Sequence, residues 1–270
     1  ITADETVTVQ SYAETDADAF SLGVEVTGVG GGYQYASADV SPEIDTYIGG
    51  GTIEAGSAVN VRTYYNTGTD GKAKDQGAQA IAGAGTVAVV GGNGAVSDAT
   101  SRADVETYVT SDAEIALTGT LSVESLANND AYANADGFFG GLAGAGTSFP
   151  TARSEGTTRS RIDGKVTEAG AVTLRTDARN EADSLAISGS FGLASGRGSV
   201  ADASVSATSS TGLGSNSSIT GVTGNVSVSS VSTTDADAEA DGGSISLLVG
   251  YGLQDASASV TNSNEAQVGE

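Results

Sequence analysis

Carboxylates at every second position are the residues of this chain that could do chemistry. The densest set is Asp235, Asp237, Glu239 and Asp241, with an alanine between each pair of acids. Carboxylate oxygens are the ligands that Ca²⁺ prefers, so Asp235, Asp237 and Asp241 are candidate metal ligands. Residues two apart on a strand are separated by about 6.6–7 Å, so one ion would need further ligands from a neighbouring segment. We favour the alternative of a solvated acidic face, and the sequence predicts no cofactor other than this possible calcium.

The residue types give little support to catalysis. The chain has neither His nor Cys, so a serine nucleophile would depend on Lys72, Lys74 or Lys165, and none of these has a recognisable setting. Glycine-rich segments such as residues 140–144 lack the Gly-Lys-Ser/Thr ending of a phosphate-binding loop. We therefore predict that the protein is not an enzyme and has no catalytic residues.

Tyrosines could bind a partner through their rings. Aromatic rings pack against sugars and in protein interfaces, and they are also common at half-buried positions of strands. We favour the half-buried interpretation. The tyrosines in question are Tyr33, Tyr35, Tyr47, Tyr64, Tyr65, Tyr108, Tyr132 and Tyr251.

A fivefold internal repeat must position these side chains. One motif consists of an apolar residue, a gap, and then two apolar residues at positions two apart. This opening motif begins at Ile1, Ile53, Ile115, Val166 and Ile219. Self-similarity at a nearly fixed period is typical of architectures in which stacked units share one core. We therefore predict one continuous repeat array over residues 1–270. Its units are residues 1–52, 53–114, 115–165, 166–218 and 219–270.

Each unit has the pattern of β-structure. Strict alternation of alanine with acids, as in residues 235–241, has the period of a strand, and helical spacing is not sustained. We expect four to six short strands and two or three coils per unit, forming an all-β, elongated, right-handed β-solenoid-like rod. An antiparallel stack of long β-hairpins is the alternative, because a Gly-rich centre between alternating segments also indicates a hairpin. The second unit is longer, and its polar, Gly-broken segment 66–75 predicts a surface loop.

Charge limits the partners. The chain has 34 acidic and 11 basic residues, a net charge of −23, which disfavours nucleic acid and anionic lipid. No apolar run approaches the ~18 residues of a membrane-spanning helix. Because there is no initiator methionine, basic n-region or apolar h-region, we expect a processed chain or a segment of a longer one.

The repeat units resemble those of a known class of proteins. Ile53–Val61, Asp235–Gly243 and Ala256–Val260 are similar to units in the repeat arrays of giant bacterial surface proteins, the filamentous-haemagglutinin-like adhesins and related extracellular fibre proteins. The resemblance implies an exported, rod-like β-structure, located outside the cell or on its surface, with a role in attachment, matrix or appendage formation. The expected function is that of a structural subunit or segment of an extracellular filament. An adhesin stalk or glycan-binding surface rod is the alternative.

The two ends of the array predict how copies would assemble. Solenoids normally have capping units, because an open terminal coil exposes strand edges that recruit other chains. Here the first and last units read as ordinary repeats. A head-to-tail contact between such ends does not close on itself and yields an open filament. We therefore predict a head-to-tail homopolymer. The residues placed at its contacts are Ile1, Val7, Val9, Val260 and Val268.

Overall fold

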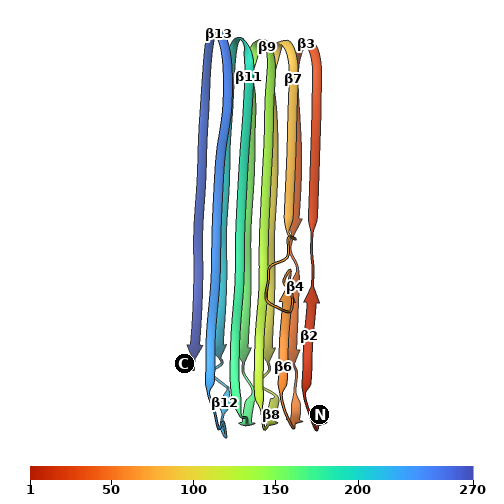
Figure 1. The fold of residues 1–270 in the computed structure, drawn as a ribbon, viewed down its shortest axis with the longest axis vertical. Helices are drawn as coiled ribbons and strands as arrows, with labels where there is room; N and C mark the ends of the chain where they lie inside the picture. Colours follow the sequence, from red (N-terminus) through yellow and green to blue (C-terminus); the bar gives the residue numbers. More distant parts are fainter. Residues whose placement is uncertain (270) are drawn as a thin grey trace.

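The computed structural model describes residues 1–269, which form parallel strands and contain no helix, and hence none that could cross a bilayer (Figure 1). The fold is an elongated β-solenoid-like stack, as the sequence predicts. Its strands are β1 (Thr2–Ala3), β2 (Val7–Ala13), β3 (Ala17–Val40), β4 (Glu43–Ile48), β5 (Gly51–Ala55), β6 (Val59–Tyr65), β7 (Ala78–Val109), β8 (Ala113–Leu117), β9 (Thr120–Ile162), β10 (Lys165–Glu168), β11 (Ala171–Leu213), β12 (Ser218–Ile219) and β13 (Val226–Val268).

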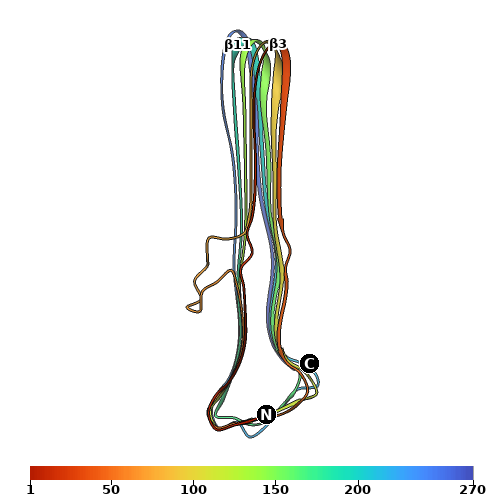
Figure 2. The same ribbon diagram turned by 90° about the vertical axis from the view of Figure 1, so that its right-hand side faces the viewer.

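Each repeat makes a single coil, so the prediction of two or three coils per repeat was wrong. A coil consists of one short strand at the base and one very long strand, which rises, bends over an arch and descends (Figure 2). In the last three coils the long strand is continuous over 43 residues, as in β9. In these three coils the expected four to six short strands are replaced by one long strand, because the Gly-rich centre of each repeat bends the strand without ending it, whereas in the first coil the long strand is interrupted and appears as β2, β3 and β4.

The coils stack in parallel register. Equivalent residues of the opening motif lie side by side in adjacent coils. Val7 pairs with Val59, Val59 with Leu121, Leu121 with Val172, and Val172 with Val226. All ladders between named strands in the described residues are parallel, which excludes an antiparallel stack of hairpins. The longest axis of the molecule runs along the strands rather than along the stack (Figure 1).

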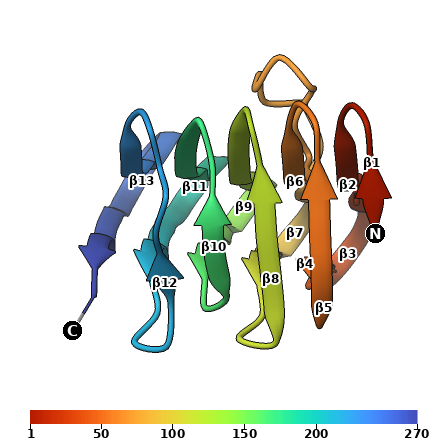
Figure 3. The same cartoon turned by 90° about the horizontal axis from the view of Figure 1, so that it is seen from below.

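The core changes in character from the base of each coil towards its arch. At the base, the short strands form a third wall (Figure 3). The wide interior there is filled by Ile, Leu and Val side chains such as Ile115, Leu121 and Leu174. Farther along, only two legs face each other, and the narrow interior is filled by alanines such as Ala80, Ala133 and Ala182. We call these parts the base and the shaft.

A row of buried hydroxyl groups crosses the shaft near the base. The contacting side chains are, in order, Ser11, Thr46, Thr63, Thr107, Ser125 and Ser160, which alternate between the rising and the descending legs of the first three coils. The last four contacts in this row have O···O distances of 2.7 to 3.0 Å. Because each hydroxyl group both donates and accepts, the row can satisfy its members without water.

Residues 66–77 form the loop that the sequence predicts in the long second unit, and the loop projects from the side of the stack (Figure 2). Asn66, at its start, has a φ of 46°. Its side-chain oxygen accepts from the Thr15 N–H (2.9 Å), and its amide nitrogen donates to the carbonyl oxygens of Thr15 (3.1 Å) and Gln76 (3.3 Å). Asn66 therefore satisfies backbone groups at the point where the long strands of the first two coils are interrupted.

Candidate functional site

The acidic alternations of successive repeats come together on the outer face of the rising legs. Asp130, Glu181 and Asp235 occupy equivalent positions in adjacent coils, and Asp183 and Asp237 do so two residues farther along. Neighbouring strands lie ~4.8 Å apart, so the carboxylates stand next to one another across the stack. We call these five residues the acidic column.

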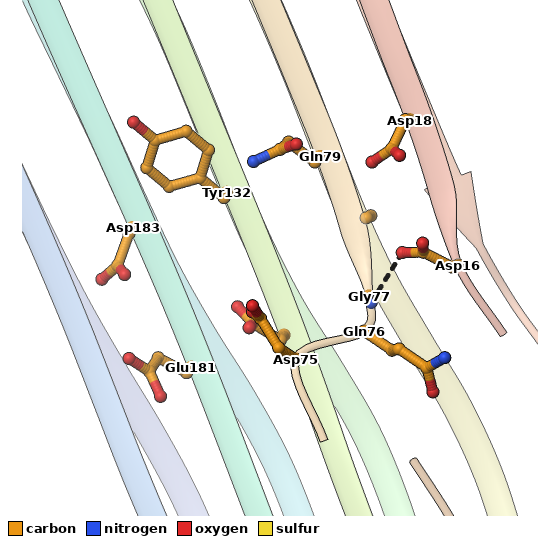
Figure 4. Close-up of a pocket in the computed structure, with 11 residues that line it drawn as sticks. Asp16, Asp18, Asp75, Gln76, Gly77, Gln79, Tyr132, Glu181 and Asp183 are labelled. Atoms are coloured by element: carbon orange, nitrogen blue, oxygen red, sulfur yellow. Dashed lines mark hydrogen bonds between the residues drawn. The ribbon is translucent and has the colours of Figure 1, made fainter. Parts of the chain in front are cut away.

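An open groove of about 440 Å³ lies at the acidic column. Asp16 and Asp18 of the first coil and Asp75 of the loop contribute further carboxylates, and Gln79 and Tyr132 lie between the acids (Figure 4). Asp16 accepts a hydrogen bond from the Gly77 N–H (3.2 Å). The groove is therefore lined mainly by groups that carry negative charge at neutral pH.

Burial and like charge raise the pKa of Asp130 and Asp183 in the column. Partial burial is the main reason that the pKa of Asp130 rises to about 6, and the charges of Glu181, Asp183 and Asp75 add to it. The pKa of Asp183 is raised by burial and then by the charges of Glu181, Asp237 and Asp235. Arg179 forms an ion pair with Glu181 (2.8 Å) and opposes the shift at Asp130.

The arrangement does not by itself build a metal centre. Within residues 1–269, no three Asp or Glu side chains lie together in a way that could hold a metal ion. Of the candidate calcium ligands, Asp235 and Asp237 belong to the acidic column, whereas Asp241 lies beside Ile187 in the adjacent coil. Calcium binding therefore stays a prediction, and two of the three residues are placed among neighbouring carboxylates.

The lysines considered for catalysis are placed as follows. Lys72 and Lys74 lie in the loop, where Lys72 pairs with Asp70 (3.1 Å) and Lys74 pairs with Glu14. Lys165 begins β10 at the base of the fourth coil. The absence of enzymatic activity stays a prediction.

Tyrosines stack between coils, an arrangement that the sequence analysis missed. The rings of Tyr12 and Tyr64 are 4.8 Å apart and nearly parallel, and those of Tyr47 and Tyr108 are 5.0 Å apart. The Arg161 guanidinium lies 4.7 Å from the centroid of the Tyr108 ring. A signal was present in the sequence, because Tyr12 and Tyr64 are 52 residues apart, one period of the repeat.

Other tyrosines have different surroundings. Tyr65 is fully buried, and its hydroxyl group makes a 2.9 Å hydrogen bond with Thr15. Burial raises the pKa of Tyr65. Tyr33, Tyr35 and Tyr251 are exposed near the arches, and Tyr132 lies in the acidic groove. The tyrosines therefore do not gather into one binding platform.

The residues expected at assembly contacts lie on the first and last coils. Val7 and Val9 point inward on the first coil but are only half-buried, whereas their neighbours Val59 and Val61 are fully buried. On the last coil, Val260 is 49% exposed, while its partner Val205 is 2% exposed. The remaining two, Ile1 and Val268, are exposed at opposite ends of the stack.

Comparison with protein-family models, with curated proteins and with solved structures finds no match for this chain.

Proposed function

We propose that the chain is a structural subunit or segment of an extracellular filament that grows by adding coil upon coil. The observation that carries this proposal is the pair of open edges at the two ends of the stack. β13 pairs with β11 on one side only, and β2, β3 and β4 pair only with the second coil. A further coil in the same register would occupy either edge.

The geometry of the stack supports growth in one direction without closure. Successive coils are related by a simple parallel offset, so the two end faces differ and a contact between them is heterologous. A parallel strand edge with unpaired N–H and C=O groups is a template for another strand. The next coil is supplied either by a second copy or by further sequence in the same chain.

Burial of inward side chains would drive this contact. Val7, Val9 and Val260 point into the core columns of their coils and are partly exposed at the open ends. Burying an aliphatic side chain contributes about 1.5–3 kcal/mol when the burial is complete. The unpaired edge would add backbone hydrogen bonds along a strand of 43 residues.

Electron microscopy of the purified protein at increasing concentration tests the proposal. We expect filaments whose length grows with concentration, and we expect Val7→Asp with Val9→Asp to stop growth because the acids would be buried at the contact. Deletion of residues 219–270 removes one whole repeat, so the new last coil still ends at the same point of the repeat as before. Growth should therefore continue with a shorter axial repeat. Unchanged polymerisation of the Val7/Val9 variant would show that the ends are not the contact.

A glycan-binding surface rod is the second candidate, because Tyr47, Tyr108 and Arg161 form an outward-facing column. The Tyr108 ring is covered by Tyr47 on one face and by Arg161 on the other. A ligand could therefore contact the edges of both rings and the outer face of Tyr47. A glycan-binding assay on wild type and Tyr47→Ala distinguishes the candidates. Binding by a chain that stays monomeric, lost in the variant, would favour the rod.

A further inference from the structure

The arch end of the molecule has apolar side chains on its outside. Of the 29 large apolar residues that are exposed, 22 lie within residues 20–35, 87–90, 138–149, 187–193 and 245–253, which surround the five arches. The inner coils show that this is not only an effect of the open ends. Val87, Phe138, Leu142 and Phe191, all in the second to fourth coils, are 48%, 53%, 50% and 52% exposed. We call these outward side chains the arch ridge.

The arch ridge is also almost free of charge. The chain has 45 charged residues (34 acidic plus 11 basic), yet 19 of the 22 ridge residues lie in five stretches that contain none of them, and the other three, Phe20, Leu22 and Val24, precede Glu25. In Figure 1 the arches lie together at one end of the molecule. The uncharged stretches are residues 26–38, 76–97, 137–152, 184–196 and 242–254.

Close packing of the two legs explains why these side chains cannot turn inward. An added Cβ at Gly137 on the rising leg would collide with the Thr147 carbonyl oxygen of the descending leg, and one at Gly144 would collide with the ring of the buried Phe139. Apart from Phe139, which is itself fully buried, large inward side chains are therefore excluded from the arch. Steric exclusion does not require the outward residues to be apolar, since Ser or Thr would fit there equally well. Their apolar character calls for a surface that covers them.

We propose that a second copy of this chain covers the arch ridge, so that two molecules associate arch end to arch end. The area is that of a modest contact. A fully buried aliphatic side chain removes about 60–120 Å² from water at 25 cal/mol per Å², so the nine ridge side chains of the second to fourth coils, which are about half exposed, offer roughly 400 Å². The ridge side chains of the first and last coils add to this area, and a contact below the ~800 Å² per partner of a standard interface is typical of a weak, reversible pair.

The shape of the ridge suits a self-complementary contact. Phe138 and Phe191 project from the rising side of the third and fourth coils. On the descending side, Ala143, Ala194 and Tyr251 help to line an apolar hollow of about 430 Å³. A two-fold contact places the same surface on both partners, so projecting rings of one copy can occupy the hollow of the other.

Charge favours a second copy over a lipid surface. Proteins that lie in a membrane interface usually surround their apolar face with Lys and Arg, whereas this chain has a net charge of −23. In an arch-to-arch pair, the acidic shafts point away from each other, and most of their charges are farther apart than the ~8 Å Debye length at physiological salt. Side-by-side packing of shafts would instead bring like charges together.

This inference does not depend on filament growth, and the test separates the two. The Val7→Asp/Val9→Asp variant, which cannot extend through the first coil, is the parent for all measurements. We expect light scattering coupled to size-exclusion chromatography to show a dimer, and small-angle scattering to show a maximum dimension close to twice that of the monomer. A monomer at all concentrations, or a dimer no longer than the monomer, would overturn the proposal.

Substitutions on the ridge identify the contact. Leu142→Glu with Leu193→Glu, both outward and mid-stack, should weaken the dimer roughly 100-fold or more, because each charge would be buried twice in a symmetric interface. The matched control is Val231→Glu, an outward valine on the shaft that is 45% exposed, which should leave the dimer unchanged. Equal effects at both sites would contradict the assignment. So would a monomeric parent that binds phosphatidylcholine vesicles through the same leucines.

Discussion

The base and the arch end of each coil are made by the same strands, yet they place apolar residues on opposite sides. At the base, Leu121 and Leu174 point inward and are fully buried, and the third wall of short strands widens the interior. At the arch end, Leu142 and Leu193 point outward and are exposed. Among the described residues, Phe139 is the one large ring buried near an inner arch, and otherwise the comparison indicates that the width of the interior decides where a large apolar side chain can lie.

Truncating one leucine in each region should show the largest difference. Leu121→Ala removes a fully buried side chain from the base and should lower the free energy of unfolding by about 2–5 kcal/mol, since the rigid walls leave a cavity. Leu142→Ala is the matched change at the arch end, where the side chain is already 50% exposed in the monomer, and should lower the free energy of unfolding by no more than about 1 kcal/mol. Urea unfolding of dilute protein measures both. Similar losses at the two sites would show that the arch end is also packed in the monomer.

The narrow shaft can be tested by adding a single carbon atom. A Cβ at Gly156 would collide with the Asn129 side-chain amide and lie 2.8 Å from Asn180 Oδ1. These amides are buried and joined by a 2.9 Å hydrogen bond. Gly156→Ala should therefore cost about 1–3 kcal/mol of stability through overpacking.

Gly198→Ala is the control for that substitution, because the new Cβ would lie 3.6 Å from Thr147 Cγ2, an ordinary contact. Its effect on the urea midpoint should be within error or slightly stabilising. If both substitutions are tolerated, the legs are able to separate, and the width of the interior is not what excludes large side chains.

The hydroxyl row tests whether the shaft near the base needs polar contacts. Thr107 donates to Thr63 (2.7 Å) and accepts from Ser125 (2.8 Å) within the buried interior. Thr107→Val keeps the shape but removes the donor to Thr63 and an acceptor of Ser125, which retains the Arg159 carbonyl oxygen as its acceptor, so we expect a loss of about 1 kcal/mol in the free energy of unfolding. Thr100→Val, on the outside of the same leg, is the control and should have little effect. Equal stability of the two variants would mean that the row contributes nothing specific.

The sequence predicted the repeat, the all-β solenoid and the loop after Tyr65, because periodicity and turn residues report these features directly. It did not predict one coil per repeat. Stretches such as Gly140–Gly144 combine glycine with small apolar residues, and that pattern is the same whether a strand ends or bends over an arch. A strand that ends and a strand that bends over an arch are distinguished only by the long-range contact between the two legs.

For the candidate sites, alternation predicted an acidic face, and the period could have aligned its members into the acidic column. What the sequence could not give is the side on which Val87 or Phe191 lies. Alternation defines two faces of a strand without saying which is inside, and the usual assumption that apolar residues point inward is wrong at the arch end. The arch ridge could therefore be identified only from the structure.

The smallest expected effect concerns the acidic column, which occupies the outer face of the shaft as the arch ridge occupies that of the arch end. The pKa of Asp130 is about 6 in the folded protein, against 3.8 for an ordinary aspartate. Between these values the folded state binds more protons than the unfolded state, so stability rises as the pH falls through about 6 and is lost as the pH rises again. Asp183 and Asp136, whose pKa values are also raised, act in the same direction.

Because the groove is open to solvent, we expect the gain from Asp130 between about pH 7 and pH 5 to be only about 1 kcal/mol. Urea unfolding at the two pH values measures it. Asp130→Asn removes the proton-binding group and should flatten this part of the profile, while raising stability at neutral pH because a repelled charge is gone. Asp18→Asn, in the same groove but on the open first coil, is the control. A protein that becomes less stable on mild acidification would show that the column is held together by its charges, for example through a bound cation, rather than strained by them.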